Sequence, residues 1–239
     1  MKKTIVTIPT YNEKENIRIL INSILKLKIG GLEILVIDDN SPDKTYKIVE
    51  NISKKNKKVH LLLRTEKRGR GYAGKAGFIW ALNHKADYII EMDADLSHNP
   101  KYIPQFLEKI KRADVVLGSR LTQGGRDARE NIGRRAITKL ANMYIRLVLG
   151  LNIRDCNSGY RCFTRQALTK IQPEKIISRG PQIVQEVLFK ARLKNLKIIE
   201  IPITFKERQI GNSKLNITQL WKSYIAILKL RVMHFLGRI

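Results

Sequence analysis

The segment "YIIEMDADLSHNP" (residues 88–100) decides the fold of this chain. Its first residues are mostly apolar and predict a short buried β-strand. Two aspartates, Asp93 and Asp95, follow directly and are separated by Ala94. Carboxylates this close repel each other unless a cation lies between them. Mg²⁺ and Mn²⁺ are hard cations that prefer such oxygen ligands, so we expect one of them at the end of this strand.

Similar apolar runs lie on both sides of this segment, and amphipathic stretches at 72–85 and 101–111 predict helices between them. Strands that alternate with helices are typical of an α/β domain, with a mostly parallel, Rossmann-like sheet and helices on both faces. The other apolar runs are "TIVTIP" (4–9), "EILVID" (33–38), "VHLLL" (59–63) and "VVLGS" (115–119).

The second half of the chain is less regular. We expect a helix at about 130–149, a short strand within 155–163, a helix at 181–194 and a strand at 197–204. No linker rich in Pro, Gly or Ser and no internal repeat divides the sequence. The simplest organisation is one compact domain with two functional halves.

Polar and acidic residues end successive strands of the predicted sheet, at 9–13, 38–43, 93–95 and 118–120. In open α/β sheets, ligands bind beyond the carboxyl ends of the strands, so these residues would converge on a nucleotide-diphosphate site. Asp38 or Asp39 would accept hydrogen bonds from the base or ribose, with Glu13 nearby. The alternative is that each acidic cluster only caps a turn or a helix.

The segment "GRGYAG" (69–74) matches the dinucleotide-binding pattern G-x-G-x-x-G. It follows the third strand rather than the first, and no acidic residue with the expected ribose role ends a strand about 20 residues later. A dinucleotide role is therefore disfavoured. A glycine-rich turn that approaches the nucleotide or the sugar remains open.

The composition predicts an anionic partner. Among 239 residues, 46 Lys and Arg face 21 Asp and Glu, which gives a net charge of +25. Nucleic acid is one candidate, but no nucleic-acid-binding motif is present, and acidic strand ends would repel a phosphate backbone. Cys156 and Cys162 indicate free thiols rather than a disulfide framework. The N-terminus predicts a strand rather than a signal peptide, and no apolar run is long enough for a transmembrane helix.

A basic stretch follows the fifth strand. From residue 120 to 139, six cations face only Asp127 and Glu130. Guanidinium groups suit a phosphate-bearing acceptor, because they bind it in a bidentate manner and screen its repulsion from a second phosphate. A solvated helix face is the alternative. The six cations are Arg120, Arg126, Arg129, Arg134, Arg135 and Lys139.

Three further residues near these segments carry open assignments. Asp155 and Glu186 would either act as a weak base, orient an arginine, or make structural hydrogen bonds. His98 follows the aspartate pair closely, and we favour a supporting or capping role for it over metal ligation.

The C-terminal segment 215–239 predicts a basic amphipathic helix. Its charges are Lys222, Lys229, Arg231 and Arg238, without any acidic residue. Such a helix with aromatic residues is typical of the membrane interface, and the alternative is a helix packed on the domain. Its apolar stripe consists of Ile217, Leu220, Trp221, Tyr224, Ile225, Leu228, Val232, Phe235 and Leu236.

Five ordered motifs together resemble the family 2 glycosyltransferases of the GT-A fold, and within them the dolichyl-phosphate (polyprenyl-phosphate) mannosyltransferases. The resemblance covers about residues 4–215, and "R-x-x-G-x-S-K-L" (208–215) narrows it to the polyprenyl-phosphate branch. The motifs are "IPTYNE" (8–13), "VIDDNSPDKT" (36–45), "MDADLSHNP" (92–100), "GSR…GG" (118–125) and "FKERQIGNSKL" (205–215).

The resemblance implies a role for each matching position. The donor nucleotide would lie against the first two motifs, and the metal, Mg²⁺ or Mn²⁺, would bind Asp93 and Asp95. Part of the family has a further ligand, a Gln, where this chain has Ser97. Implied donor-site residues are Pro9, Tyr11, Glu13, Asp38, Asp39, Asp93 and Ala94. Implied catalytic residues are Asp95, Arg120, Arg208 and Lys214, and implied acceptor-phosphate ligands are Arg120, Arg134, Lys139 and Ser213.

The resemblance also implies the domains and the reaction. A catalytic domain would span 1–215, with a nucleotide-sugar half (1–119) and an acceptor half (120–215), followed by the membrane-associating helix at 216–239. The expected reaction moves mannose from GDP-mannose to a dolichyl or polyprenyl phosphate, with inversion, at the cytoplasmic face of a membrane.

Two groups of alternatives remain open. The same reaction would use UDP-glucose in a glucosyltransferase, and a non-catalytic protein would use the basic surface to bind nucleic acid or membrane. The chain would reach its lipid through the C-terminal helix or through a small membrane-anchoring subunit.

Overall fold

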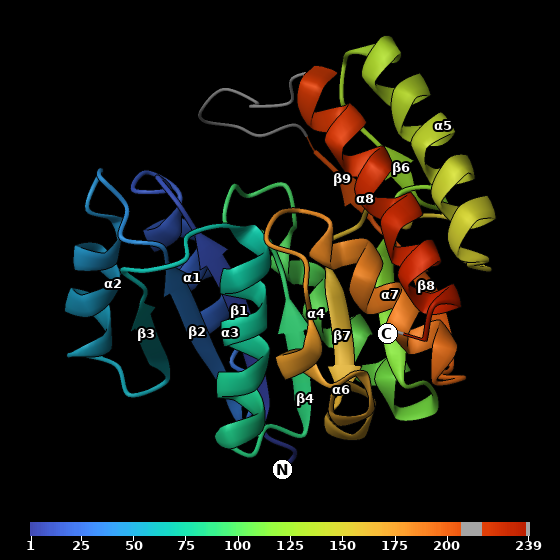
Figure 1. Ribbon diagram of the computed structural model, residues 1–239. Coiled ribbons are helices and arrows are strands. Elements are labelled where there is room, and N and C mark those ends of the chain that lie inside the picture. Colours follow the sequence, from blue (N-terminus) through green and yellow to red (C-terminus); the bar gives the residue numbers. More distant parts are fainter. Residues whose placement is uncertain (207–216, 238–239) are drawn as a thin grey trace.

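The computed structural model describes the backbone of residues 1–206 and 217–237, and the side chains of 1–206 and 224–237. A seven-stranded sheet with the order β3-β2-β1-β4-β7-β5-β8 forms its centre (Figure 1). The strands are β1 (Thr4–Thr10), β2 (Leu32–Asp38), β3 (Val59–Leu63), β4 (Tyr88–Glu91), β5 (Val115–Ser119), β7 (Arg161–Thr164) and β8 (Ile198–Pro202). Two short strands, β6 (Arg126–Asp127) and β9 (Thr204–Phe205), pair separately.

The sheet is mostly parallel, as the sequence predicts. Strand β2 pairs in parallel with β3 and β1, β1 pairs in parallel with β4, and β5 pairs in parallel with β8. Only β7 runs antiparallel, and it lies between β4 and β5. Because both neighbours run opposite to β7, the carboxyl ends of β1, β2, β4 and β5 meet at one edge of the sheet.

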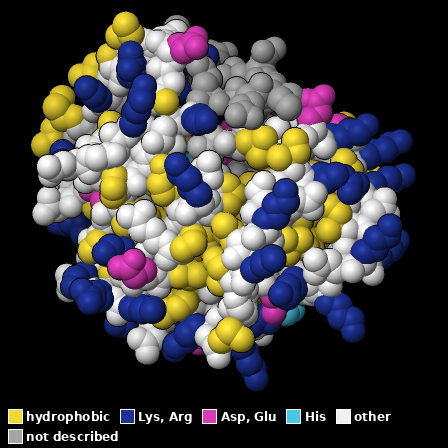
Figure 2. Space-filling view, turned by 180° about the vertical axis from the view of Figure 1, so that it is seen from behind, with side chains coloured by type: hydrophobic (Ala, Val, Ile, Leu, Met, Phe, Trp, Pro, Cys, Tyr) yellow, Lys and Arg dark blue, Asp and Glu magenta, His cyan; other side chains and the backbone are white. Residues whose placement is uncertain are grey.

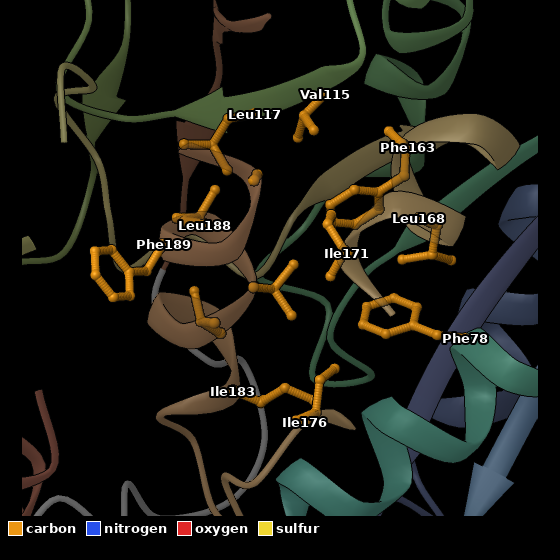
Figure 3. Close-up of a cluster of buried hydrophobic side chains, with 14 of the residues drawn as sticks. Phe78, Val115, Leu117, Phe163, Leu168, Ile171, Ile176, Ile183, Leu188 and Phe189 are labelled. Carbon is orange, nitrogen blue, oxygen red and sulfur yellow. The ribbon is translucent and has the colours of Figure 1, made fainter. Parts of the chain in front are cut away.

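The strands are apolar on both faces because helices cover both faces. Neighbouring residues of β4 show this: Ile89 packs into one hydrophobic core and Ile90 into the other, and both are fully buried. Three helices supply the core on one face: α1 (Ile17–Leu25), α2 (Thr45–Ser53) and α4 (Ile103–Lys109). Part of the core on the other face is shown in Figure 3 around Phe78, Phe163 and Phe189. Its helices are α3 (Arg70–Asn83), α5 (Ile132–Leu149), α6 (Arg165–Ile171), α7 (Ile183–Leu193) and α8 (Ile217–Phe235).

The helices agree with most of the predicted ones. The expected helix at 101–111 is split into η1 (Pro100–Tyr102), α4 (Ile103–Lys109) and η2 (Ile110–Arg112), where prolines stand at the first turns of η1 and α4. Helix α6, capped by Thr164, was not predicted. A further short helix, η3 (Pro173–Lys175), follows α6.

The two longest helices, α5 and α8, lie side by side (Figure 1). The Tyr144 hydroxyl of α5 donates a hydrogen bond to the Tyr224 carbonyl of α8 at 3.1 Å, and their rings make an edge-to-face contact. Ile227 and Leu230 anchor α8 in the core, with 2% and 3% of their surfaces exposed. None of the helices in the described residues is long and apolar enough to cross a bilayer.

Candidate active site

A cavity of about 640 Å³ opens at the carboxyl edge of the sheet. It is bordered by the ends of β1, β2 and β4 and by the turn that begins α3, so segments far apart in the sequence meet there. The lining residues are Pro9, Thr10, Tyr11, Glu13, Asp39, Arg68, Gly69, Arg70, Ala73, Asp93, Ala94, Asp95 and Pro181. All of the expected donor-site residues except Asp38 are among them, together with Asp95.

Asp93 and Asp95 lie just beyond the end of β4, with both side chains partly exposed at the cavity wall. One oxygen of Asp95, Oδ1, accepts hydrogen bonds from the Ser97 backbone amide at 3.1 Å and the Ser97 hydroxyl at 2.6 Å. Ser97 therefore holds Asp95 in place, at the position where part of the family has a further metal ligand. It is buried, with 2% of its surface exposed.

The donor set suits a hard divalent cation. Two carboxylates face the cavity, and a diphosphate in the cavity would complete the oxygen coordination that Mg²⁺ or Mn²⁺ requires. Among the residues with described side chains, no group of three His, Cys, Asp or Glu could hold a metal ion by itself. A metal ion held here would therefore need further ligands from a bound molecule.

A row of alternating charges leads from the core to this pair. Glu91, the last residue of β4, is fully buried and pairs with Arg161 of β7 on one side and with Arg70 of α3, at 2.7 Å, on the other. Arg70 in turn approaches Asp93, with 3.5 Å between Nη2 and Oδ1. No sequence pattern indicates a role for Glu91, Arg70 or Arg161, because these residues stand at the ends of β4, α3 and β7, which only the fold brings together.

These contacts shift the pKa values of the acids. Burial disfavours the charged form of Glu91, but Arg161 and Arg70 outweigh burial and lower its pKa. Burial also opposes ionisation of Asp93, but the positive charges of Arg70 and Arg161 outweigh burial and lower its pKa as well. Both acids are therefore carboxylates at neutral pH, as the charge pairing requires.

His98 supports the site from behind. Its Nδ1 accepts a hydrogen bond from the Asp93 backbone amide at 3.0 Å, and its ring stacks on Tyr160 with 5.0 Å between centroids. Burial lowers the pKa of His98, outweighing the attraction of Asp93 and Asp95. A neutral imidazole that accepts the amide proton is consistent with the supporting role expected from the sequence.

At the other end of the cavity, the structure separates the two candidate nucleotide acids. Asp38 is fully buried, and its oxygens accept hydrogen bonds from Thr10 and from the backbone and hydroxyl of Ser41. It thus shapes the turn after β2. Asp39 lines the cavity and accepts hydrogen bonds from Arg64 and from the Gly69 amide, each at 2.6 Å. Burial raises the pKa of Asp39, although these two donors oppose the shift.

The glycine-rich turn at the start of α3 belongs to the cavity. Gly69 has a φ of 135°, a backbone conformation that favours glycine, and its amide reaches Asp39. A Cβ on Gly71 would lie 2.1 Å from the Ser178 carbonyl oxygen, so the turn packs directly on the loop before α7. The segment therefore lies at the expected nucleotide site. The sequence had left open that this glycine-rich turn approaches the nucleotide or the sugar.

A second, smaller cavity of about 90 Å³ lies next to the aspartate pair and is lined by Asp93, Arg120 and Asp155, among others. Arg120 is buried and paired with Asp155 through Nε at 2.8 Å and Nη2 at 3.2 Å. The guanidinium carbon also lies 4.7 Å from the centroid of the Phe205 ring. Asp155 orients an arginine, one of the roles that the sequence left open for it.

The other predicted site residues lie elsewhere. Glu186 is fully buried and accepts hydrogen bonds from the backbone amides of Ile177 and Ser178, which is a structural role. Arg134 and Lys139 are on α5 and line neither of these two cavities. Arg208, Ser213 and Lys214 fall outside the described residues.

The sheet, the cavity at its carboxyl edge and the aspartate pair define a glycosyltransferase of the GT-A fold. The glucosyl-3-phosphoglycerate synthase of Mycobacterium tuberculosis, solved with Mn²⁺, uridine diphosphate and glucosyl-3-phosphoglycerate, shares this fold. Its TM-score is 0.70 at 19% identity, over 96% of this chain and 80% of that one. The sequence model of glycosyl transferase family 2 matches residues 5–172, and the chain belongs to this family.

Two curated relatives cover nearly the whole chain. The undecaprenyl-phosphate mannosyltransferase of Micrococcus luteus is 37% identical over 214 residues, which is 90% of this chain and 88% of that protein. The polyprenol monophosphomannose synthase of Mycolicibacterium smegmatis is 36% identical over 217 residues, which is 90% of this chain and 82% of that protein. The resemblance to polyprenyl-phosphate mannosyltransferases is thereby confirmed.

Proposed function

We propose that the chain transfers mannose from GDP-mannose to a dolichyl or polyprenyl phosphate, with inversion, at the cytoplasmic face of a membrane. The observation that carries the proposal is that Asp93 lines two cavities. The larger has the size for a nucleotide sugar and includes acidic and basic side chains in its wall. The smaller contains Arg120, an arginine able to bind an anion, beside Asp155. The two relatives named for mannosyl transfer to polyprenyl lipids support the choice of sugar and acceptor.

In the donor cavity, Asp39 and Glu13 would bind the nucleoside end, between Pro9 and Tyr11. Asp93 and Asp95 would hold the metal, with Ala94 between them. A bound Mg²⁺ or Mn²⁺ supplies charge stabilisation to the leaving diphosphate. Arg70 would add a fixed positive charge beside the same diphosphate, because Glu91 orients it and only a 3.5 Å contact ties its Nη2 to Asp93.

On the acceptor side, the nucleophile would be an oxygen of a lipid phosphate. A phosphate is already an anion, so the step needs no strong general base. It needs positive charge to place the acceptor near the donor diphosphate. Arg120, which Asp155 holds in place, is the described side chain that best meets this requirement. The other proposed acceptor-side residues are Arg134, Lys139, Arg208, Ser213 and Lys214.

Calorimetric titration with GDP-mannose, UDP-glucose and GDP, each with Mn²⁺ and with chelator, tests the proposal. We expect GDP-mannose to bind tightly with Mn²⁺ and not with chelator, and mannose to appear on a polyprenyl phosphate in a following transfer assay. A preference for UDP-glucose would mean that the chain transfers glucose rather than mannose by the same mechanism. The absence of binding to any of the three would overturn the proposal, and a salt-dependent gel shift would then test the nucleic-acid alternative.

A further inference from the structure

A further cavity, of about 490 Å³, lies where α6, α7 and the end of α8 meet. Helix α7 contacts both of the other helices, and the three elements come together near the label C in Figure 1. None of the described residues that line this cavity lines either of the two cavities beside Asp93. Its size is within the range of about 300–1,000 Å³ that is usual for small-molecule sites. We call it the basic cavity.

The lining of the basic cavity combines positive charge with apolar surface. Its described residues include three lysines, Lys175, Lys190 and Lys194, and no acidic residue. Ile171 at the end of α6 and Leu193 at the end of α7 supply apolar surface. An ammonium group has three hydrogen-bond donors and no acceptor, so a group of three lysines favours an anion. The apolar surface favours a ligand that also has a carbon part.

Lys190 distinguishes this cavity from the generally basic surface. On the face of the molecule shown in Figure 2, Lys and Arg far outnumber acidic side chains, so exposed lysines alone mark no site. Lys190, however, is only 8% exposed, and its Nζ donates a hydrogen bond to the Lys175 carbonyl at 2.7 Å and lies 3.6 Å from Oε1 of Glu186. Burial lowers the pKa of Lys190, although Glu186 opposes the shift. An anion in the cavity would reduce the cost of holding this cation away from water.

The nearby acids do not neutralise the three lysines. Glu186 is fully buried, and its oxygens also accept hydrogen bonds from two backbone amides at 2.9 Å and 2.7 Å. The other acid that acts on Lys190 is Glu174, whose side chain is exposed to water. Lys175 and Lys194 are exposed at the edge of the cavity and form no ion pair with any described residue. Their charge therefore remains available to an external anion.

We propose that the basic cavity is an anion-binding site separate from the active site, and that it takes a small water-soluble molecule with a phosphate group and an apolar part. Lys175 and Lys194 bind the phosphate, because their ammonium groups are unpaired and reach the cavity from two elements. Lys190 adds a fixed positive charge, and Ile171 and Leu193 contact the carbon part. The inference goes beyond the proposed function, which places no ligand between α6, α7 and α8.

The loop before α7 connects the basic cavity with the glycine-rich turn of the donor cavity. Ile177 lines the basic cavity, and Glu186, the partner of Lys190, accepts a hydrogen bond from its amide. Two residues further on, the Arg179 carbonyl accepts a hydrogen bond from the Gly71 amide at 3.0 Å. A ligand that holds the lysines of the basic cavity in place should therefore reduce local opening of this loop and of the turn that packs on it.

Calorimetric titration of the full chain with butyl phosphate and with inorganic phosphate tests the inference. A chelator is present throughout, so that no metal draws the anion to the donor cavity. The cavity variant is Lys175→Gln with Lys194→Gln. The matched control is Lys55→Gln with Lys58→Gln, which removes the same charge from two exposed positions beside α2, away from the basic cavity. All four lysines are exposed, so both variants should keep the fold, which their melting temperatures verify.

We expect the cavity variant to bind butyl phosphate about tenfold or more weakly than the original chain, because it lacks two charge-assisted hydrogen bonds. The control should bind like the original chain. Butyl phosphate should bind more tightly than inorganic phosphate, since its carbon chain contacts the apolar lining. Hydrogen exchange with and without butyl phosphate should show slower exchange in residues 176–179 and at the start of α3, in the original chain but not in the cavity variant.

Three results would overturn the inference. Unchanged binding in the cavity variant would mean that the anion binds elsewhere, for example at Arg120. Equal losses in the cavity variant and the control would mean that only net charge matters. Binding that depends on Lys175 and Lys194 with phosphatidylglycerol vesicles, but not with butyl phosphate, would assign these lysines to a lipid headgroup instead.

Titration of GDP-mannose with Mn²⁺ separates the inference from the proposed function. The cavity variant should bind GDP-mannose within about threefold of the original chain, because neither lysine lines the donor cavity. Binding of butyl phosphate in a chain that does not bind GDP-mannose would refute the proposed reaction and support the basic cavity. The reverse result would refute the basic cavity alone.

Discussion

The cavity at the carboxyl edge of the sheet and the helices α5 and α8 use charged residues in opposite ways. Around the cavity, charges are buried and paired, as in Asp39 with Arg64 at 2.6 Å and Glu91 with two arginines. On α5 and α8, Arg146 and Lys229 are exposed and form no ion pair with any described residue. Paired charges fix the geometry of a site, whereas unpaired cations beside apolar side chains remain available to an external partner. The following predictions test this difference.

The largest expected effect comes from Glu91→Gln. This variant leaves Arg161 buried without a negative partner, which should lower the free energy of unfolding by about 3–5 kcal/mol. Denaturant unfolding at neutral pH measures the change. The control is Glu33→Gln, whose pairs with Lys3 and His60 lie near the surface and should contribute less than about 1 kcal/mol. Equal losses in the two variants would contradict the buried-pair account.

The pairing of Glu91 with Arg161 and Arg70 predicts part of the loss of folding stability in acid. Glu91 has a lowered pKa in the folded state, so its contribution to stability is present above the ordinary glutamate pKa of about 4.3 and is lost as the pH falls through the folded value. The Glu91→Gln variant has no such contribution to lose. Its melting temperature should therefore fall less steeply with decreasing pH below about 4.3 than that of the original chain.

Asp95→Ala should reduce transfer by about 10²–10³-fold while the melting temperature stays nearly unchanged, because the side chain is only partly buried. Loss of the Mn²⁺ dependence of nucleotide binding is the second measurement. The control uses the other end of the same strand: Asp87→Asn, before β4, removes the charge of a carboxylate that accepts a hydrogen bond from the Lys3 amide, and it should leave transfer intact. Full activity of Asp95→Ala would refute the metal assignment.

Gly71→Ala should have a smaller effect, of about 1–3 kcal/mol, because the new methyl group would overlap the Ser178 carbonyl oxygen. Nucleotide affinity should fall with stability, since the same turn carries Arg70. Gly133→Ala is the matched control near the start of α5, where the methyl group meets only the Asn131 side chain and helix propensity gains about 0.5–1 kcal/mol. Equal behaviour of the two would show that the α3 turn is not sterically constrained.

The smallest effect should come from helices α5 and α8. Arg146→Gln with Lys229→Gln should change the free energy of unfolding by less than about 0.5 kcal/mol, because both side chains are exposed. A loss comparable to that of Glu91→Gln would mean that these cations serve the fold, and the contrast between the two regions would disappear.

The first half of the chain, residues 1–119, could be predicted from the sequence because its signals are local. Strand–helix alternation gave the mostly parallel sheet, and the rule that ligands bind at carboxyl ends brought Asp39 and Asp93 to one cavity. Sequence alone could not separate Asp38 from Asp39, since the two neighbours differ only in which way the turn after β2 directs each side chain.

Other features depended on contacts between distant segments. In the sequence, Glu91 is only a polar residue within an apolar strand. Its partner Arg161 lies on β7, 70 residues away, and the fold alone brings the two side chains together. Periodicity identified α8 as amphipathic, but the helix has two apolar sides, and only packing distinguishes the buried Ile227 from the exposed Leu228. Removal of 216–239 would therefore disturb the core as well as membrane association, so point substitutions give the cleaner test.

The insertion of β7 between β4 and β5 has a consequence for the order of folding. Strands β4 and β5 follow one another in the chain but do not pair, so β3-β2-β1-β4 and β5-β8 are joined only through residues 161–164. During synthesis, the first four strands can assemble early from local βαβ units, while closing the centre of the sheet must wait for a segment about 70 residues later. Arg161 arrives on that strand, so the support beneath Asp93 is completed only when the two parts of the sheet have joined.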